Sequence, residues 1–185
     1  LGLGRADLRP DAAMGYAAAC AARTGPVPEG NVGAGTGASV GKLFGPAGAM
    51  KSGLGTASIE IGGGVVVGAI VAVNAFGDVV DPATGGILAG ARPARVGPLR
   101  LGGEGPFADT QKMMATPAGR VILRLAAGRN TVIGAVAANV RFTKAEANKM
   151  AQMAHDGLAR AVRPAHTMLD GDTLFALATG GRKAH

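Results

Sequence analysis

The stretch TVIGAVAANVRFTKAEANKMAQMAHDGLARAVRP, residues 131–164, contains the pattern that decides the fold. Residues 131–140 form an apolar run rich in Val, Ile and Ala, which favours a β-strand. Residues 143–164 predict a helix, because Thr143 and Glu146 have the spacing of a capping box and Pro164 ends the pattern. The apolar stripe of this helix is expected to comprise Met150, Met153, Ala154, Leu158 and Ala161. A strand followed by an amphipathic helix predicts a protein of the α/β class.

Further strands are expected on both sides of this stretch. Residues 172–180 predict a final strand. Residues 54–81 predict a hairpin in which two β-rich runs flank the glycine triplet 62–64, and a short third segment follows Asn74.

The other segments are less regular. A helix is expected over residues 9–24, because Pro10 and Asp11 suit its first turn and a Gly-Pro pair ends it. The remaining segments are a glycine-rich loop over 25–45, a long connection of weak periodicity over 82–118, and a short helix or turn over 117–130.

Composition fits one domain over residues 1–185 and excludes several classes of protein. The chain is 48% hydrophobic but only 3% aromatic and has 32 glycines, so its core must be aliphatic with many tight turns. The net charge is +7, but the basic residues are scattered and not interleaved with aromatics, so no nucleic-acid partner is expected. The longest apolar run, residues 65–73, is too short to span a membrane and suits a buried strand.

Cys20 is the single cysteine of the chain. It excludes an intramolecular disulfide and fits a reducing compartment, so a cytoplasmic location is expected. Because Cys20 lies in an Ala-rich helical stretch, we expect a buried apolar residue rather than a reactive thiol. No signal peptide is visible and the chain begins at Leu1, so we expect a fragment or a chain whose ends were removed.

The glycine-rich segment GAGTGASVGKL, residues 33–43, suggests a phosphate-binding loop but departs from the known patterns. A P-loop requires glycine where Thr36 stands and a hydroxyl where Leu43 stands. A dinucleotide-binding turn requires a different glycine spacing directly after a strand. Two interpretations stay open: a backbone that closely approaches another segment, or a loop that delivers Lys42 into a pocket.

Familiar catalytic and metal-binding patterns are missing from the sequence. It has no HExxH, CxxC or GxSxG motif, so we expect no metal site and no nucleophile elbow. His155 falls on the predicted helix, where a partly exposed or core histidine is more common than a ligand, and His166 falls in a loop. Asp170 and Asp172 flank Gly171 just before the last predicted strand. They form either an ordinary Asp-Gly turn or two carboxylates held near a reacting centre.

Several motifs together resemble one family of proteins. They are GNVGAGTGASVGKLFG (30–45), MKSGLGTAS (50–58), NTVIGAVAANV (130–140) and MAHDGLARAVRPAHTMLDGDTLFALATG (153–180). This set is similar to the self-processing aminopeptidases and amidases, which include the L-aminopeptidase/D-esterase/amidase, the β-peptidyl aminopeptidases and the nylon-oligomer hydrolases. The resemblance covers nearly all the chain and is weakest over 86–125. It implies a layered α-β-β-α sandwich of the N-terminal-nucleophile type, a small peptide or amide substrate, a homo-oligomer and no cofactor.

The resemblance also implies a nucleophile. Family members are made as one inactive chain that cuts itself once, and the matching bond here joins Asn130 to Thr131. Cleavage would give chains 1–130 and 131–185, with Thr131 as the new N-terminal residue. A threonine hydroxyl is a weak nucleophile that needs a base. The new α-amine, with an ordinary pKa of roughly 7.7–8.0, can supply that base without a histidine.

Four further site residues are implied by the resemblance. Lys42 matches a lysine of the nylon-oligomer branch, whose cation would keep the nucleophile's amine neutral and stabilise negative charge. Asn74 matches an asparagine on the oxyanion side of the site. Asp170 and Asp172 match the pair that orients the nucleophile, so we expect both to point inward and at least one to reach Thr131.

The chain departs from the family at its ends. Relatives have a sizeable segment before the point that matches Leu1 and continue past His185, so truncation at both ends is expected. The main hypothesis is an N-terminal-threonine amidohydrolase that matures at Asn130–Thr131. The alternatives are a non-catalytic protein that binds anions through its glycine-rich loop, and an inactive truncated homologue.

Overall fold

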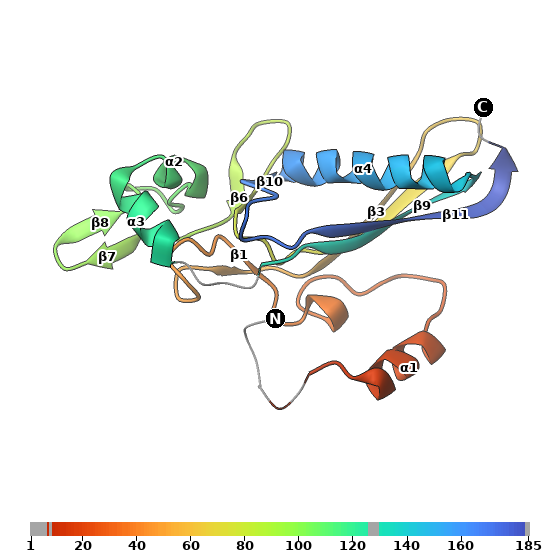
Figure 1. Cartoon of the computed structure of the whole chain (residues 1–185), viewed down its shortest axis with the longest axis horizontal. Helices are drawn as coiled ribbons and strands as arrows, with labels where there is room; N and C mark the ends of the chain where they lie inside the picture. Colours follow the sequence, from red (N-terminus) through yellow and green to blue (C-terminus); the bar gives the residue numbers. More distant parts are fainter. Residues whose placement is uncertain (1–6, 8, 126–129, 184–185) are drawn as a thin grey trace.

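A four-stranded sheet forms the centre of the structure, a computed structural model that describes residues 7, 9–125 and 130–183 (Figure 1). Its strand order is β11-β9-β4-β3, with β3 (Leu54–Glu60), β4 (Val66–Ala72), β9 (Ile133–Arg141) and β11 (Thr173–Lys183). The β9–β11 pair is parallel and the other two pairs are antiparallel. The strands predicted over 131–140 and 172–180 and the hairpin predicted within 54–81 are therefore confirmed.

The hairpin turn between β3 and β4 depends on its glycines. Gly62, Gly63 and Gly64 have φ angles of 101°, 60° and 70°, a region that other residues rarely adopt. The short third segment expected after Asn74 is β5 (Asp78–Val80), which pairs antiparallel with β6 (Ile87–Ala89) and β10 (Val162–Arg163). A second, smaller sheet thus adjoins the carboxyl end of β4.

Helix α4 (Lys144–Ala161) joins the parallel strands β9 and β11 and covers one face of the sheet (Figure 1). The predicted capping box is present: Glu146 N donates to Thr143 Oγ1 at 3.3 Å, and Thr143 N donates to Glu146 Oε2 at 2.7 Å. The expected stripe needs one correction, because Met153 is 58% exposed. At 3.6 residues per turn, Met153 lies to one side of the line through Met150, Ala154 and Leu158.

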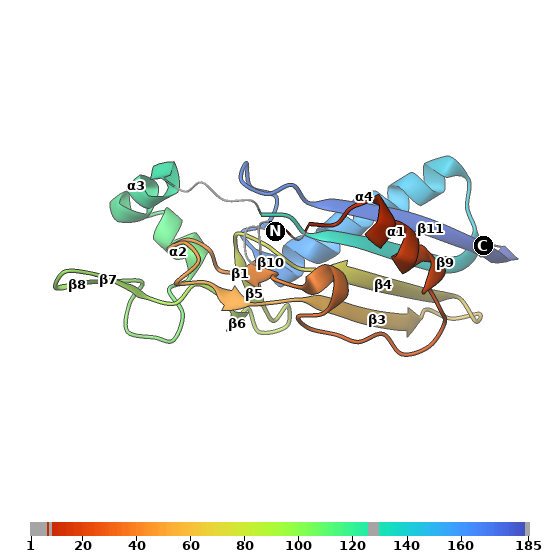
Figure 2. The same cartoon turned by 90° about the horizontal axis from the view of Figure 1, so that it is seen from below.

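Figure 2 views the sheet from the side opposite α4. On this face, several apolar side chains are exposed in the described part of the chain. Ile70 and Phe175 are both register partners of Ala135, so they project on one side of the sheet. The exposed fractions are 37% for Ile70, 46% for Ile133, 56% for Phe175 and 52% for Leu177.

Helix α1 (Ala12–Cys20) lies on the side of the sheet opposite α4 (Figure 1). Asp11 is its N-cap and not a residue of its first turn, and Asp11 Oδ1 accepts from Met14 N at 2.8 Å. None of its residues is buried, and Tyr16 is 74% exposed. The prediction of a buried Cys20 is wrong, because Cys20 is exposed on a helix that buries no residue against the described chain.

The connection over 82–118 contains more structure than its sequence predicts. A buried carboxylate, Asp78, organises it: Asp78 is 1% exposed and accepts from Ala91 N at 2.8 Å, Thr110 N at 2.7 Å and Thr110 Oγ1 at 2.8 Å. Burial raises the pKa of Asp78, and these hydrogen bonds oppose the shift. The segment contains β6, β7 (Ala94–Val96), β8 (Leu99–Leu101) and α2 (Thr110–Met114), and α3 (Pro117–Leu125) follows. Residues 126–129 of the predicted helix or turn lie outside the described residues.

Buried apolar residues hold the segments that carry the predicted site residues. Leu43, Ala75 and Val132 are 2%, 3% and 0% exposed, and each directly follows a predicted site residue. Ala75 and Val132 share one apolar cluster with Val40 and Val162, while Leu43 packs with Phe76 in a second. Within the described residues, no helix is long and apolar enough to cross a membrane. The predicted α/β class is confirmed.

Candidate active site

Strand directions bring the predicted site residues to one end of the main sheet. Because β9 and β11 are parallel with Ile133 opposite Thr173, the residues that precede the two strands begin side by side. Because β4 is antiparallel to β9 with Ala72 opposite Ile133, the carboxyl end of β4 reaches the same edge. Asn74, Thr131 and the 170–172 segment therefore meet, although they are far apart in the sequence.

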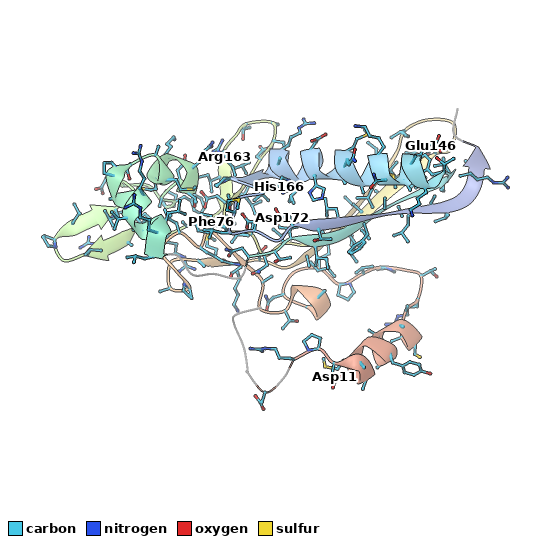
Figure 3. All side chains as sticks on the ribbon, in the orientation of Figure 1. Asp11, Phe76, Glu146, Arg163, His166 and Asp172 are labelled. Atoms are coloured by element: carbon cyan, nitrogen blue, oxygen red, sulfur yellow. The ribbon has the colours of Figure 1, made fainter. Side chains whose placement is uncertain are left out.

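Side-chain positions agree with this topology. Figure 3 shows Phe76, His166 and Asp172 close together at this end of the sheet, whereas Glu146 lies at the far end of α4. Asn130 forms an isolated parallel bridge with Asp170, which extends the β9–β11 pairing towards the site.

The bond between Asn130 and Thr131 lies at the centre of the site. Thr131 Oγ1 donates to Asn130 O at 2.5 Å, so the hydroxyl lies against the carbonyl group of that bond. Thr131 N donates to Asn74 O at 3.0 Å. Asn130 is 3% exposed, and its Nδ2 donates to Leu169 O at 3.1 Å. Its Oδ1 is a buried atom with no hydrogen-bond partner in the described chain.

Lys42 and Asn74 form the cationic side of the site. Lys42 Nζ donates to Asn74 O at 3.0 Å and to Asn74 Oδ1 at 2.6 Å, and Ser39 N donates to Asn74 Oδ1 at 3.2 Å. Lys42 and the Thr131 nitrogen therefore share one acceptor, Asn74 O. Burial lowers the pKa of Lys42 to about 8, and the negative charge of Asp170 partly opposes this shift.

The glycine-rich loop satisfies both interpretations left open by the sequence. A Cβ added to Gly41 would lie 1.9 Å from Ala91 N, and one added to Gly35 would lie 2.4 Å from Leu54 N, so both glycines allow close backbone approach. The same loop delivers Lys42 to Asn74. Its glycines thus bring the backbone close to neighbouring segments while the lysine enters the site.

Asp170 and Asp172 accept hydrogen bonds from donors other than those of Thr131. Asp170 Oδ1 accepts from Phe76 N at 3.0 Å, and its Oδ2 accepts from Thr167 N at 3.2 Å and from the Thr167 hydroxyl. Asp172 Oδ1 accepts from Val132 N at 2.9 Å.

The prediction that a carboxylate reaches Thr131 is therefore not met by these hydrogen bonds. Asp170 and Asp172 do point inward, but their oxygens are occupied by donors from neighbouring segments. The residue between them, Gly171, makes the contact instead, because its N–H donates to Asn130 O at 2.9 Å. An interpretation as a simple turn overlooks this contact, since it depends on the pairing of distant strands.

His166 is a site neighbour that the sequence interpretation left out. Its Nδ1 lies 2.8 Å from Asp172 Oδ2, and its ring centroid lies 4.9 Å from that of His155. The signal available in the sequence was its position in HTMLDGD, just before the Asp pair. In the described part of the chain, no three His, Cys, Asp or Glu side chains are grouped closely enough to hold a metal ion.

Comparison with known sequences gives this arrangement a context. The sequence model of Peptidase family S58 matches residues 5–185. An uncharacterized aminopeptidase of Mycobacterium bovis is 44% identical over 184 residues, which are 97% of this chain and 48% of that protein. A 6-aminohexanoate-oligomer endohydrolase of Kocuria sp. is 38% identical over 170 residues, which are 92% of this chain and 45% of that protein. The chain spans about half the length of the curated relatives that it matches.

Solved structures agree at the level of the fold. A beta-aminopeptidase of Burkholderia sp. matches with a TM-score of 0.54 and 29% identity, over 92% of this chain and 38% of that one. The L-aminopeptidase D-Ala-esterase/amidase of Ochrobactrum anthropi, described as a variant of the Ntn-hydrolase fold, matches with a TM-score of 0.51 and 21% identity, over 85% of this chain and 34% of that one. The predicted fold class is thus confirmed, because the fold of this chain is similar to the folds of these two enzymes. Because the family model matches nearly the whole sequence, the chain belongs to Peptidase family S58.

Proposed function

We propose that this chain carries the nucleophile and the self-cleavage bond of an amide-bond hydrolase. The chain cuts itself between Asn130 and Thr131, and Thr131 then hydrolyses amide bonds of peptides or peptide-like oligomers through an acyl-Thr131 intermediate. The observation that carries the proposal is the position of the Thr131 hydroxyl against the Asn130 carbonyl, with the Thr131 nitrogen bound to the acceptor that also binds Lys42.

The proposed self-cleavage is an acyl shift, which this geometry supports. Thr131 Oγ1 attacks the carbonyl carbon of Asn130, an ester to Oγ1 forms, and the C–N bond to Thr131 breaks. The proton of the hydroxyl is lost and the Thr131 nitrogen gains one, so the shift itself is balanced. Water then hydrolyses the ester, leaving a carboxylate on Asn130 and restoring the hydroxyl of Thr131.

The mature site would repeat the chemistry on a substrate. The α-amine of Thr131 accepts the hydroxyl proton as Oγ1 attacks the substrate carbonyl, and water releases the acyl group. A cation at Lys42 disfavours protonation of that amine, because the two nitrogens share Asn74 O. The reaction therefore requires no catalytic histidine, and His166 serves as a partner of Asp172.

Mass spectrometry of the purified protein tests the proposal. We expect two chains, residues 1–130 and 131–185, with threonine at the new N-terminus. A screen against α-peptides, β-peptides, D-amino-acid amides and 6-aminohexanoate oligomers would then define the substrate, since the names of the relatives support these classes. An uncut chain without hydrolytic activity would favour the alternative of an inactive homologue. Cytoplasmic location and homo-oligomeric assembly stay predictions.

Replacing Asn74 by alanine is expected to reduce kcat by on the order of 100-fold, with a smaller effect on KM. The substitution removes the Oδ1 atom that accepts from Lys42 Nζ and Ser39 N. Steady-state kinetics on the best substrate of the screen measures the effect. Asn139→Ala is a matched control, because Asn139 also bonds to backbone, at Val66 N and Gly64 O, but lies on β9 outside the site. An equal loss of activity in the control would indicate general loss of structure.

Replacing Asp170 or Asp172 by asparagine is expected to slow self-cleavage while the protein stays folded. In each case an amide NH₂ group replaces an oxygen that accepts from a donor, so at least one hydrogen bond is lost. The rate of appearance of the two chains measures the effect. Asp81→Asn is the control, because the Asp81 carboxylate accepts from Ala83 N and Thr84 Oγ1 within an ordinary turn. If both site variants cut themselves at the wild-type rate, Asp170 and Asp172 would be ordinary turn residues.

A further inference from the structure

Gly171 contributes its backbone N–H to the bond proposed to be cleaved. This N–H donates to Asn130 O at 2.9 Å in the uncut chain, so the donor is already directed at the oxygen on which negative charge would develop. Asn130 O is the atom that gains negative charge when Thr131 Oγ1 attacks the adjacent carbon. The hydrogen bond from Thr131 Oγ1 to the same oxygen is lost as the hydroxyl gives up its proton. The bond from Gly171 does not depend on that proton.

The two carboxylates fix the backbone on either side of Gly171. Asp170 is held by Phe76 N, from the segment after β4, and by Thr167. Asp172 is held by Val132 N, from the residue after the nucleophile, and by His166. The pair therefore connects Gly171 to the segment that carries Thr131 and to the segment that carries Asn74. This function explains why Asp170 and Asp172 point inward without bonding to Thr131.

The absence of a side chain at residue 171 also has a local reason. A Cβ at this position would lie 3.1 Å from Thr131 Oγ1 and 3.8 Å from Asn130 O. The φ angle of Gly171 lies outside the left-handed region, so backbone conformation alone does not demand glycine. Space for the nucleophile favours glycine, because a methyl group would make a tight contact with the Thr131 hydroxyl and shift it by a few tenths of an ångström.

We propose that the Gly171 N–H is the oxyanion donor of the self-cleavage step, and that Asp170 and Asp172 are its positioning residues. As the bond from Thr131 Oγ1 to the Asn130 carbonyl carbon forms, the carbonyl electron pair moves to Asn130 O, where Gly171 N–H stabilises it. The pair returns as the C–N bond breaks and the Thr131 nitrogen takes up a proton, leaving the ester that water hydrolyses. This inference rests on the proposed self-cleavage.

The test removes the N–H and leaves the rest of the chain intact. Cell-free translation of the full chain with glycolic acid at position 171 replaces the amide by an ester, so the donor to Asn130 O is lost. The matched control carries the hydroxy-acid analogue of threonine at position 173, which removes the bond from Thr173 N to Val132 O at 2.8 Å. Both esters remove one backbone hydrogen bond between the same two segments. Alkaline cleavage at the ester verifies incorporation, and mass spectrometry follows the appearance of the chain that begins at Thr131.

We expect the ester at 171 to slow self-cleavage by on the order of 100-fold relative to the ester at 173. Equal rates for the two esters would overturn the proposal, whether both are fast or both are slow. A wild-type chain that does not cut itself would instead overturn the self-cleavage on which the proposal rests.

A second pair of variants keeps the N–H and tests the space around it. Gly171→Ala should lose most of its self-cleavage, because the methyl displaces the nucleophile from its position of attack. Gly157→Ala on α4 should cleave at the wild-type rate, since an added Cβ there meets nothing within 4 Å. Unimpaired cleavage in a folded Gly171→Ala protein would contradict the steric part of the proposal.

Discussion

The Thr131→Ala protein is expected to remain a single chain of 185 residues under conditions in which we expect the wild type to separate into two. Alanine keeps the backbone that leads into β9 and the bond from residue 131 N to Asn74 O, but removes Oγ1, the atom that lies against Asn130 O. Without that oxygen no ester can form, so self-cleavage and hydrolysis should both be abolished. Intact-mass measurement on the purified protein gives the result directly.

Two further variants make the result specific. Thr131→Ser keeps a hydroxyl and should still cut, although its rotamer is less restricted than that of the β-branched threonine. Thr179→Ala removes an exposed threonine on β11, distant from the site, and should cut like the wild type. If Thr131→Ala were cut between residues 130 and 131 at the normal rate, a host protease would be responsible and Thr131 would lose its proposed function.

The elements that the sequence predicted well are those with a strong local pattern. Thr143 and Glu146 mark the start of α4 through contacts within one helical turn. The β3–β4 hairpin likewise depends on adjacent apolar runs and a glycine turn. The segment over 82–118 lacked such a pattern, because it is held by Asp78, a residue from another part of the chain. Burial at Cys20 could not be read from an Ala-rich helix, since burial depends on what packs against that helix.

The candidate site shows the same division. From residue patterns alone, Asp170 and Asp172 could belong either to a turn or to a reacting centre. The choice of Thr131, Lys42 and Asn74 came from the family resemblance. The parallel register of β9 and β11 decides which atoms meet. It puts Gly171 N, rather than a carboxylate, against Asn130 O. No local spacing in the sequence encodes that register.

Replacing Lys42 by methionine is expected to slow self-cleavage by on the order of 100-fold without lowering the stability of the fold. Both oxygens that accept from Lys42 Nζ keep another donor, because Asn74 O retains Thr131 N and Asn74 Oδ1 retains Ser39 N. Burial lowers the pKa of Lys42 from its ordinary value of 10.5 to about 8, so the wild-type fold loses stability as pH falls from 10.5 to 8. Below about pH 8 this penalty is complete, and Lys42→Met avoids it. Chemical denaturation at neutral pH should find the variant at least as stable as the wild type. Lys51→Met, at an exposed lysine on the short strand β2 (Met50–Lys51), is the control for cleavage.

The pH dependence of self-cleavage tests whether the charge of Lys42 is the active feature. In the uncut chain the nitrogen of Thr131 is an amide and does not titrate. The Thr131 nitrogen therefore does not contribute to the pH dependence of self-cleavage. If the cation assists the reaction, the rate should fall as pH rises through about 8, where Lys42 loses its proton. In Asp170→Asn the midpoint should move to lower pH, because the negative charge of Asp170 raises the pKa of Lys42. A rate that increases steadily across this range, with the same profile in Lys42→Met, would remove the lysine cation from the mechanism and leave Lys42 as a ligand of Asn74 only.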